Sequence, residues 1–385
     1  MDSTAYTFIG TKIRLKPTKE QEILLWKSAG CSRFIYNWAL DKEADNYEKG
    51  NKFINDKVLR REMTKLKKEE NFKWLCEVGS NVLKQAVKDL CLAYKKFFDK
   101  KAGFPKHKSR KSNISFYVNY ESMKKTQNGV QCEKLGNIKT AEPLPKLLKG
   151  EYYLNPHISY DGKYWYISFS RKIEIHKTEH NNTTVGIDLG IKEFATMSDC
   201  TKVENLKLSK EYEKKLKREQ RKLSRRCKLA KDSDKKLSDS KNYQKQKKKV
   251  AKIHNKIRNK RKDFINKLST KIINNHDIIC IEDLNIKGML KNHKLAKSIS
   301  DVSWSEFVRQ LEYKANWYGR KIIKVPTFYP SSKTCSSCGN IKETLKLSER
   351  IYHCECCELE IDRDYNASIN ILRKGLEILK EEKVS

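Results

Sequence analysis

The chain has 385 residues, more than one typical domain holds, and this length predicts two or three domains. Lysine and arginine number 83 against 48 acidic residues, which gives a formal net charge of +35. A charge of this size favours nucleic acid as the partner over an anionic membrane surface. Because the sequence has no long apolar run and no signal-peptide pattern, it predicts a soluble protein that is neither secreted nor held in a membrane.

The basic residues are mostly lysine, with 66 lysines against 17 arginines. Lysine binds phosphate as a point charge, whereas arginine can also read a base edge through two parallel hydrogen bonds. The balance therefore favours contacts to a nucleic-acid backbone over recognition of bases by side chains.

The first hundred residues predict one strand followed by helices. Alternating apolar side chains indicate a strand over residues 6–16. Thr18 and Gln21 then have the spacing of a capping box, which is typical of a helix N-terminus. Helical periodicity continues in three segments, residues 20–47, 58–66 and 80–98.

Residues 103–111 form a basic loop that breaks this pattern, and from residue 115 to 175 the apolar period becomes two. Asp161-Gly162 marks a hairpin turn within that segment. We therefore expect a β-barrel built from residues 1–16 and 111–180, with a helical domain over residues 17–110 inserted into it.

The second half alternates strands with helices, which is typical of an α/β domain. Strands are predicted over residues 185–190, 191–197, 278–281 and 321–326. Helices are predicted over residues 207–275, with a break near 233–240 that makes a hairpin, and over residues 303–318 and 366–379.

Five of the twelve cysteines lie close together near the end of the chain. Four of them form two C-x2-C pairs separated by fifteen residues, Cys335, Cys338, Cys354 and Cys357. Four thiolates at this spacing predict one tetrahedral, structural zinc site. Cys356 and His353 are nearby competitors for the last ligand position, and disulfides or free thiols are the alternative to zinc.

Three acidic residues stand where a carboxylate needs compensation or a partner. Asp188 interrupts an apolar strand, Glu282 closes the strand at 278–281, and Asp364 precedes the last helix. A carboxylate in an apolar strand is costly unless a cation or hydrogen bonds offset its burial. Three converging acids could hold two Mg²⁺ ions, the arrangement that hydrolyses phosphodiesters. Taken singly, each acid also fits an ordinary role in a turn or at a helix start.

These motifs, in this order, resemble the TnpB family of RNA-guided nucleases, which insertion sequences encode and which are related to compact type V CRISPR effectors. The resemblance is carried by Gly-Ile-Asp-Leu-Gly at 186–190, Ile-Glu-Asp-Leu at 281–284, the two cysteine pairs, and Asp-Arg-Asp-Tyr-Asn-Ala-Ser-Ile-Asn-Ile at 362–371. Shorter similarities extend it over most of the chain. Two departures are Glu358, where the family usually has glycine, and Ser368, where it often has alanine.

The resemblance implies a multidomain fold of α/β and β-barrel parts. It contains an OB-like wedge barrel with the inserted helical recognition domain, and a RuvC nuclease domain of RNase H-like fold at residues 181–330 and 361–385. A zinc-ribbon module at residues 331–360 would interrupt the RuvC domain. Asp188, Glu282 and Asp364 would be the catalytic triad with two Mg²⁺ ions, and the four cysteines would hold one Zn²⁺.

The resemblance also implies the partners. A guide RNA made from the end of the element would select the target by base pairing, beside a short motif in duplex DNA, and the triad would cut both strands in turn. We expect a cytoplasmic protein of a bacterium, associated with the nucleoid when bound. One copy per guide RNA, or a weak dimer, is expected.

Several polar and basic residues are candidates for nucleic-acid contact. Residues 207–261 carry a one-signed excess of charge that solvation alone does not explain. By resemblance, the helix at 80–98 borders the groove that reads the target-adjacent motif. The candidates are Asn81, Lys84, Gln85, Lys106, Lys108, Arg110, Lys247 and Lys248.

Other functions fit parts of the sequence. A catalytically silent RNA-guided repressor, a transposition accessory protein and a transposase that joins DNA ends share many of these motifs, and so does a zinc protein that binds nucleic acid without cutting it. An actin-like ATPase can begin with a similar strand, but it would need glycine-rich phosphate loops, and the sequence has 15 glycines and no such loop.

Overall fold

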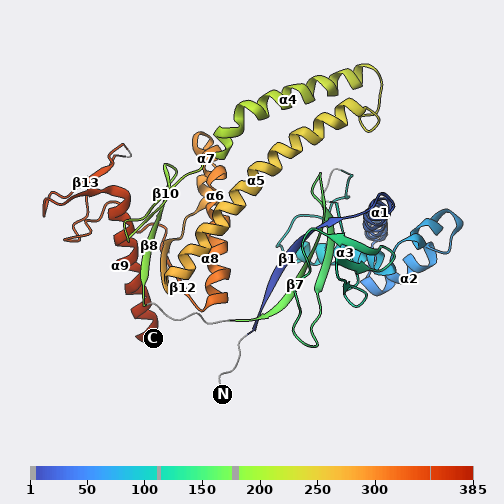
Figure 1. Ribbon diagram of the computed structural model, residues 1–385, viewed down its shortest axis with the longest axis horizontal. Helices are drawn as coiled ribbons and strands as arrows, with labels where there is room; N and C mark the ends of the chain where they lie inside the picture. The colour runs from blue at the N-terminus through green and yellow to red at the C-terminus, as the bar shows by residue number, and fades with distance from the viewer. Residues whose placement is uncertain (1–5, 111–113, 176–181, 347, 385) are drawn as a thin grey trace. The chain divides into compact units, whose positions relative to one another are not determined.

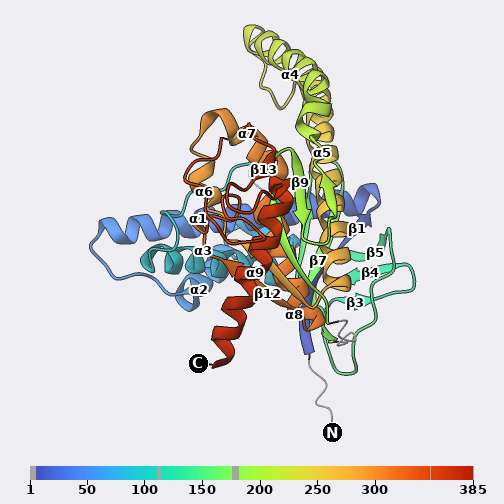
Figure 2. The same cartoon turned by 90° about the vertical axis from the view of Figure 1, so that its left-hand side faces the viewer.

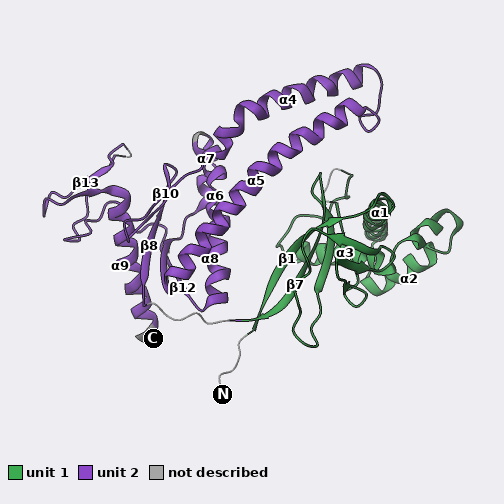
Figure 3. Ribbon diagram, in the orientation of Figure 1, with its two compact units in different colours: residues 1–174 green, residues 175–385 purple. Residues whose placement is uncertain are grey.

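A computed structural model describes residues 6–110, 114–175, 182–346 and 348–384 (Figure 1). The chain divides into two compact units, residues 1–174 and 175–385 (Figure 3). Each unit has apolar cores of its own. Within the described ranges, every helix is too short or too polar to cross a membrane.

Unit 1 contains a seven-stranded sheet in the order β2-β6-β7-β1-β5-β4-β3. Its strands are β1 (Tyr6–Lys16), β2 (Ile114–Tyr117), β3 (Lys124–Lys125), β4 (Gly129–Cys132), β5 (Gly136–Thr140), β6 (Leu154–Tyr160) and β7 (Trp165–Glu174). Long strand β1 is central, since it pairs antiparallel with β7 and, at Leu15 and Lys16, with β5. In the described part of this unit the ladder does not join β2 to β3, so the closed barrel stays a prediction.

The helices of unit 1 all lie between β1 and β2 in the chain. They are α1 (Lys19–Glu48), α2 (Asp56–Leu66), the 3-10 helix η1 (Glu70–Glu77) and α3 (Ser80–Phe98). The predicted capping box of α1 is confirmed, because the Thr18 hydroxyl accepts from the Gln21 N–H and the Gln21 amide accepts from the Thr18 N–H. Helix α3 buries Leu83, Val87 and Leu90 against α1 and α2 in a shared core, as its helical spacing predicts.

Unit 2 is built on a five-stranded sheet in the order β10-β9-β8-β11-β12. Its strands are β8 (Thr184–Leu189), β9 (Glu193–Met197), β10 (Lys202–Glu204), β11 (Ile278–Glu282) and β12 (Lys321–Val325). Strand β9 runs antiparallel to both of its neighbours, β8 and β10, while β8, β11 and β12 run parallel. Helices cover both faces of the parallel part, which explains why β8 and β11 are almost continuously apolar.

The two faces of this sheet pack against different helices (Figures 1 and 2). Ile279 and Ile281 of β11 join a core with α5 (Lys241–Asn275) and α8 (Trp304–Tyr318). The residue between them, Cys280, belongs to a separate core with Ile371 of the last helix, α9 (Arg363–Val384). Because side chains alternate along a strand, α9 lies on the face opposite α5 and α8.

The remaining elements of unit 2 lie outside the five-stranded sheet. Helix α4 (Leu208–Asp232) pairs with α5 in a long hairpin that extends beyond the sheet (Figure 1). Helices α6 (Ile286–Met289) and α7 (His293–Val302) connect β11 to α8. Strand β13 (Ile351–His353), just before Cys354, pairs with β14 (Glu360–Asp362), just before α9.

The predicted helices and strands are confirmed by these elements, with small shifts at their ends. The last helix is longer than predicted, since it begins at Arg363. Sequence analysis did not predict the short elements η1, β10, α6, α7, β13 and β14, which present few buried apolar side chains.

Candidate functional site: three acids and four cysteines

Asp188 and Glu282 end two neighbouring parallel strands. Strands β8 and β11 pair with Ile187 opposite Ile281, and each acid is the next residue along its strand. Side chains at equivalent positions of paired strands point to the same face of a sheet. The two carboxylates therefore lie beside each other at the carboxyl edge of the parallel part of the sheet.

Helix α9 crosses the face to which these acids point. A Cβ atom on Gly186, two residues before Asp188, would lie 2.6 Å from the backbone nitrogen of Leu372 and closer still to the Ser368 carbonyl. Only glycine permits such a close approach of helix and strand. Asp364 stands in the first turn of α9, about two helical turns before Leu372, so the helix brings it toward the carboxyl end of β8.

The electrostatics of Asp188 connect the three acids. Burial, and after it the negative charges of Glu282 and Asp364, raise the pKa of Asp188 to about 8. Burial also raises the pKa of Glu282, against a hydrogen bond from Ser331 that lowers it. Like charges shift one another's pKa in this way at short range, so the three carboxylates form one electrostatic group.

Glu282 and Asp364 also have partners among the protein's own side chains. The Ser331 hydroxyl donates to Oε1 of Glu282. The Arg363 guanidinium donates to Oδ1 of Asp364 from 3.2 and 3.3 Å, and Arg350 lies 3.8 Å from Oδ2. In the described part of the chain, carboxylate oxygens from all three acids do not lie within 4.8 Å of one another.

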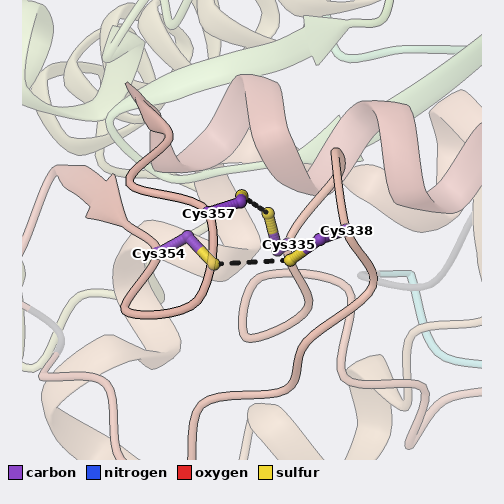
Figure 4. Close-up of side chains that lie close together, drawn as sticks. All are labelled: Cys335, Cys338, Cys354 and Cys357. Atoms are coloured by element: carbon purple, nitrogen blue, oxygen red, sulfur yellow. Dashed lines mark hydrogen bonds between the residues drawn. The ribbon is translucent and has the colours of Figure 1, made fainter.

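The cysteine pairs form the second candidate site (Figure 4). The sulfur atoms of Cys335 and Cys357 are 3.6 Å apart, as are those of Cys338 and Cys354, and all four lie within 4.8 Å of one another. A tetrahedral zinc ion with Zn–S bonds of about 2.3 Å separates its sulfurs by about 3.8 Å. The donor set and its spacing therefore fit a closed metal site. Among the described residues, this is the one group of its kind.

Backbone N–H groups of the loops donate to two of the four sulfur atoms, those of Cys354 and Cys335. The N–H groups of Cys357 and Cys356 lower the pKa of the Cys354 thiol to about 6. The Ser337 N–H donates to the sulfur of Cys335 at 3.4 Å. Thiolate is the form that binds metal, so these donors favour binding.

The residue after each pair adopts a left-handed backbone. Gly339 has φ of +79° and Glu358 has φ of +59°. This conformation suits glycine and is unfavourable for a residue with a Cβ atom. The departure at Glu358 therefore puts backbone strain into the second loop.

The neighbouring candidates for the last ligand lie outside this group. Cys356 is exposed, and Nδ1 of His353 lies 3.6 Å from Oε1 of Glu360. The four sulfurs that meet are those of the two C-x2-C pairs.

Two asparagines of the 362–371 motif, to which sequence analysis assigned no role, connect the cysteine loops to the helix that carries Asp364. Asn366 accepts from the Ser336 N–H at 2.9 Å and donates to the Thr334 carbonyl at 2.7 Å. Asn370 donates to the carbonyls of Ser331 and Thr334 at 2.9 and 2.6 Å. Both side chains are fully buried on α9. The sequence signal for them is two asparagines four residues apart on the predicted apolar face of the last helix, because buried amides need hydrogen-bond partners.

The candidates on α3 and in the basic loop are placed differently from one another. Asn81 and Gln85 are partly buried, and the Gln85 amide donates to Asp89 at 2.8 Å, while Lys84 is exposed. Lys106 and Arg110 are exposed. The Lys108 ammonium lies 3.9 Å above the ring of Tyr36, and burial lowers its pKa.

The candidates on α5 belong to a larger basic surface of the hairpin. Lys247 and Lys248 are exposed there. On α4, six basic side chains within about three turns of the helix line one hollow of about 310 Å³: Lys214, Lys217, Arg218, Arg221, Lys222 and Arg225. This surface can neutralise several phosphates at once.

Three segments of the chain match models of known protein families. Residues 167–293 match the family model described as "Probable transposase", residues 304–371 match "Cas12f1-like, TNB domain", and residues 8–52 match "Helix-turn-helix domain". Over 372 residues the chain is 35% identical to a "Putative RNA-guided DNA endonuclease" of Streptomyces pristinaespiralis, covering 95% of this chain and 89% of that protein.

The chain belongs to the TnpB family. A second TnpB relative is the "Putative RNA-guided DNA endonuclease InsQ" of Escherichia coli, 33% identical over 96% of this chain and 92% of its own. A "TnpB-like protein" of Acanthamoeba polyphaga mimivirus is 36% identical over 133 residues, which are 33% of this chain and 25% of that protein.

Solved structures also align with the whole chain. One is the "Cryo-EM structure of the Cas12f1-sgRNA-target DNA complex", at 17% sequence identity and a TM-score of 0.35, covering 95% of this chain and 99% of that one.

Proposed function

We propose that this chain is an RNA-guided DNA endonuclease of a transposable element. It binds a guide RNA made from the element's end, recognises a short motif beside the target, opens the duplex and hydrolyses both strands. Two relatives aligned over nearly their whole length carry RNA-guided DNA endonuclease in their names, which supports this activity. The charge of +35 suits a protein that holds two polyanions.

The observation that carries the proposal is the register of Asp188 beside Glu282 under helix α9, with Asp364 in that helix's first turn. Burial, and after it the negative charges of Glu282 and Asp364, raise the pKa of Asp188, and a cation at this place would relieve the repulsion. Carboxylate oxygens are the ligands that Mg²⁺ prefers.

We assign Asp188, Glu282 and Asp364 as the residues that would hold two Mg²⁺ ions. Such a pair of ions supplies an activated water and stabilises the leaving oxygen of a phosphodiester. The protein's own contribution is to hold the three carboxylates at one edge of a rigid sheet. Ser331 and Arg363, which contact two of them, orient those side chains.

The four cysteines would hold one structural Zn²⁺. A zinc ion with four protein ligands has no open position for substrate, so its role is to fold the loops around it. Through Asn366 and Asn370, those loops are bonded to the helix that carries Asp364. We infer that zinc stabilises the position of the third acid.

The basic surfaces are proposed to bind the nucleic acids, with Lys84, Lys106, Arg110, Lys247 and Lys248 on phosphates and Asn81 or Gln85 at base edges of the motif. Affinity should then fall steeply with salt, by a slope near −0.9 per phosphate contact on duplex DNA. A bacterial cytoplasm, where DNA and the guide RNA are both present, is the proposed location.

The test is cleavage by the reconstituted complex. The RNA that co-purifies with the protein is sequenced, and the complex is mixed with a duplex that matches the guide and a randomised flank, with Mg²⁺ or with EDTA. We expect cutting of both strands of the matching duplex with Mg²⁺ only, beside one enriched motif. Asp188→Ala should bind the target and leave it intact, and Asp232→Asn, an exposed acid at the end of α4, should cut normally.

A wild-type complex that binds the matching duplex in Mg²⁺ but never cuts it would overturn the nuclease assignment. That result would instead identify a guided repressor or a transposition accessory protein.

A further inference from the structure

Phe328 is the most exposed large apolar side chain in the described part of the chain. Its exposed fraction is 95%, against 81% for Tyr47, the next in rank. Leaving a phenylalanine in water forgoes the free energy that its burial would give. Its neighbour Tyr329 is partly buried in the core beneath α9, so the two successive rings have opposite surroundings.

The loop that carries Phe328 is held in place on both sides. A turn closes from the Tyr329 N–H to the Pro326 carbonyl at 3.0 Å, and Phe328 is the third residue of that turn. After it, the Asn370 amide donates to the Ser331 carbonyl at 2.9 Å. The ring is therefore presented to solvent by an ordered turn.

The same loop is bonded to the strand end that carries Glu282. Before Phe328, the Thr327 hydroxyl donates to the Asp283 carbonyl at 2.5 Å. After it, the Ser331 hydroxyl donates to the Glu282 carboxylate itself. Strand β12, from which the loop emerges, pairs with β11 so that Val325 lies opposite Glu282. Phe328 thus stands on the rim of the candidate carboxylate site.

We propose that Phe328 is a positioning residue that stacks on an unpaired base of the DNA strand entering the carboxylate site. This inference rests on the proposed nuclease function. A flat, uncharged ring can stack on the π-face of any base, whatever the sequence, whereas lysine side chains bind phosphates. The bases of an opened duplex have lost their stacking neighbours, so they can stack on a side chain that is exposed beforehand.

Stacking of one base on an aromatic side chain changes affinity by about 5- to 150-fold when the ring is removed. If the contact holds the strand in its cleavable position, Phe328→Ala should slow single-turnover cutting by a factor in this range. Phe328→Trp should restore the rate to within a few fold. Leu295→Ala, which truncates a 43% exposed side chain on α7, is the control and should leave the rate unchanged.

The readout that separates stacking from loop folding is an abasic scan. Single abasic sites are placed at each nucleotide around the cut phosphate of a pre-opened substrate. One position should slow the wild-type complex and have no added effect on Phe328→Ala, because the same contact is already lost. Equal rates for wild type and Phe328→Ala, or abasic effects that are the same in both, would overturn the inference.

A crosslinking experiment tests the contact without requiring cleavage. The Asp188→Ala complex is irradiated with a matching target strand that carries 5-iododeoxyuridine near the cut position, and the attached peptide is identified by mass spectrometry. Attachment at Phe328 supports stacking, and attachment elsewhere alone contradicts it. Failure of the wild type to cut would count against the proposed function, whereas failure to crosslink at Phe328 counts against the stacking contact.

Discussion

The cysteine group takes its ligands from two short loops separated by fifteen residues, whereas the acid group takes them from segments as far apart as Asp188 and Asp364. The cysteines therefore meet through local turns, and the acids meet through strand register and the packing of α9. Asn366 and Asn370 join the two groups, and Arg350, from the segment between the cysteine pairs, lies 3.8 Å from Oδ2 of Asp364. From this contrast we expect that unfolding of the cysteine loops displaces Asp364, whereas substitution of an acid leaves the cysteine loops folded.

Loss of zinc is expected to have the largest effect. Structural zinc sites of this kind bind with about 10–16 kcal/mol of free energy, most of it used to fold the loops. Cys335→Ser should therefore lose zinc, expose residues 335–357 to protease, and greatly reduce cleavage. Zinc content by mass spectrometry and limited proteolysis measure this. Cys356→Ser should keep one zinc per chain; its loss there would mean that the ligand set is wrong.

The asymmetry itself is tested by the reverse substitution. Asp188→Ala should abolish Mg²⁺-dependent cutting and retain one zinc ion per chain with unchanged protease resistance of the loops. Loss of zinc in this variant would show that the cysteine group depends on the acids, which contradicts the expected asymmetry.

Close packing of α9 on β8 is expected to give the next largest effect. Gly186→Ala would force a Cβ atom against the backbone at Ser368 and Leu372, and such overpacking costs about 1–3 kcal/mol or more. Urea unfolding should show that loss, and cleavage should fall because α9 carries Asp364. The control Gly30→Ala, where a Cβ meets nothing within 4 Å inside α1, should be neutral or stabilising. Equal stability of the two variants would contradict the packing.

The burial of Asp188, together with its repulsion by Glu282 and Asp364, predicts a pH effect in EDTA. The pKa of Asp188, raised to about 8, lies above the ordinary value of an unfolded chain, so folding takes up a proton between about pH 4 and pH 8. The free energy of unfolding should therefore fall as pH rises through this window. Asp188→Asn should remove that loss and stabilise the metal-free protein by roughly 1–3 kcal/mol at pH 8, and by little near pH 4.

Thermal unfolding in EDTA across this pH range measures the effect, with Asp232→Asn as the control. An Asp188→Asn variant that is less stable than wild type at pH 8 would mean that the acids do not repel one another.

The smallest effect is expected at Glu358. Its left-handed backbone favours glycine by about 1 kcal/mol, so Glu358→Gly should raise zinc affinity severalfold in competition with a chelator. Glu355→Gly, an exposed position of the same loop without positive φ, should not raise it. Equal changes at both positions would refute the backbone argument.

Features that depend on residues close together in the chain could be predicted from the sequence alone. The capping box at Thr18, the hairpin turn at Asp161-Gly162 and the cysteine spacing are set by residues near one another in the chain, so their patterns are visible directly. The period of apolar residues likewise predicted α3 and the strand pair that carries the acids.

Contacts between segments far apart in the chain could not be predicted from the sequence. That Gly186 admits α9, and that Lys108 covers the Tyr36 ring, follow from contacts between segments far apart in the chain. Phe328 appears in the sequence as one more apolar residue before a proline, and only the structure reveals its exposure. The candidate triad came from the order of motifs and a family resemblance, because spacing along a chain does not determine which carboxylates meet.

Anomalous diffraction from crystals soaked in Mn²⁺, a scattering substitute for Mg²⁺, examines the convergence of the acids most directly. The account predicts manganese peaks bounded by the side chains of Asp188, Glu282 and Asp364, which disappear from crystals of Asp188→Ala. Peaks bound elsewhere, or an Asp364 side chain turned away from ions held by the other two, would contradict it.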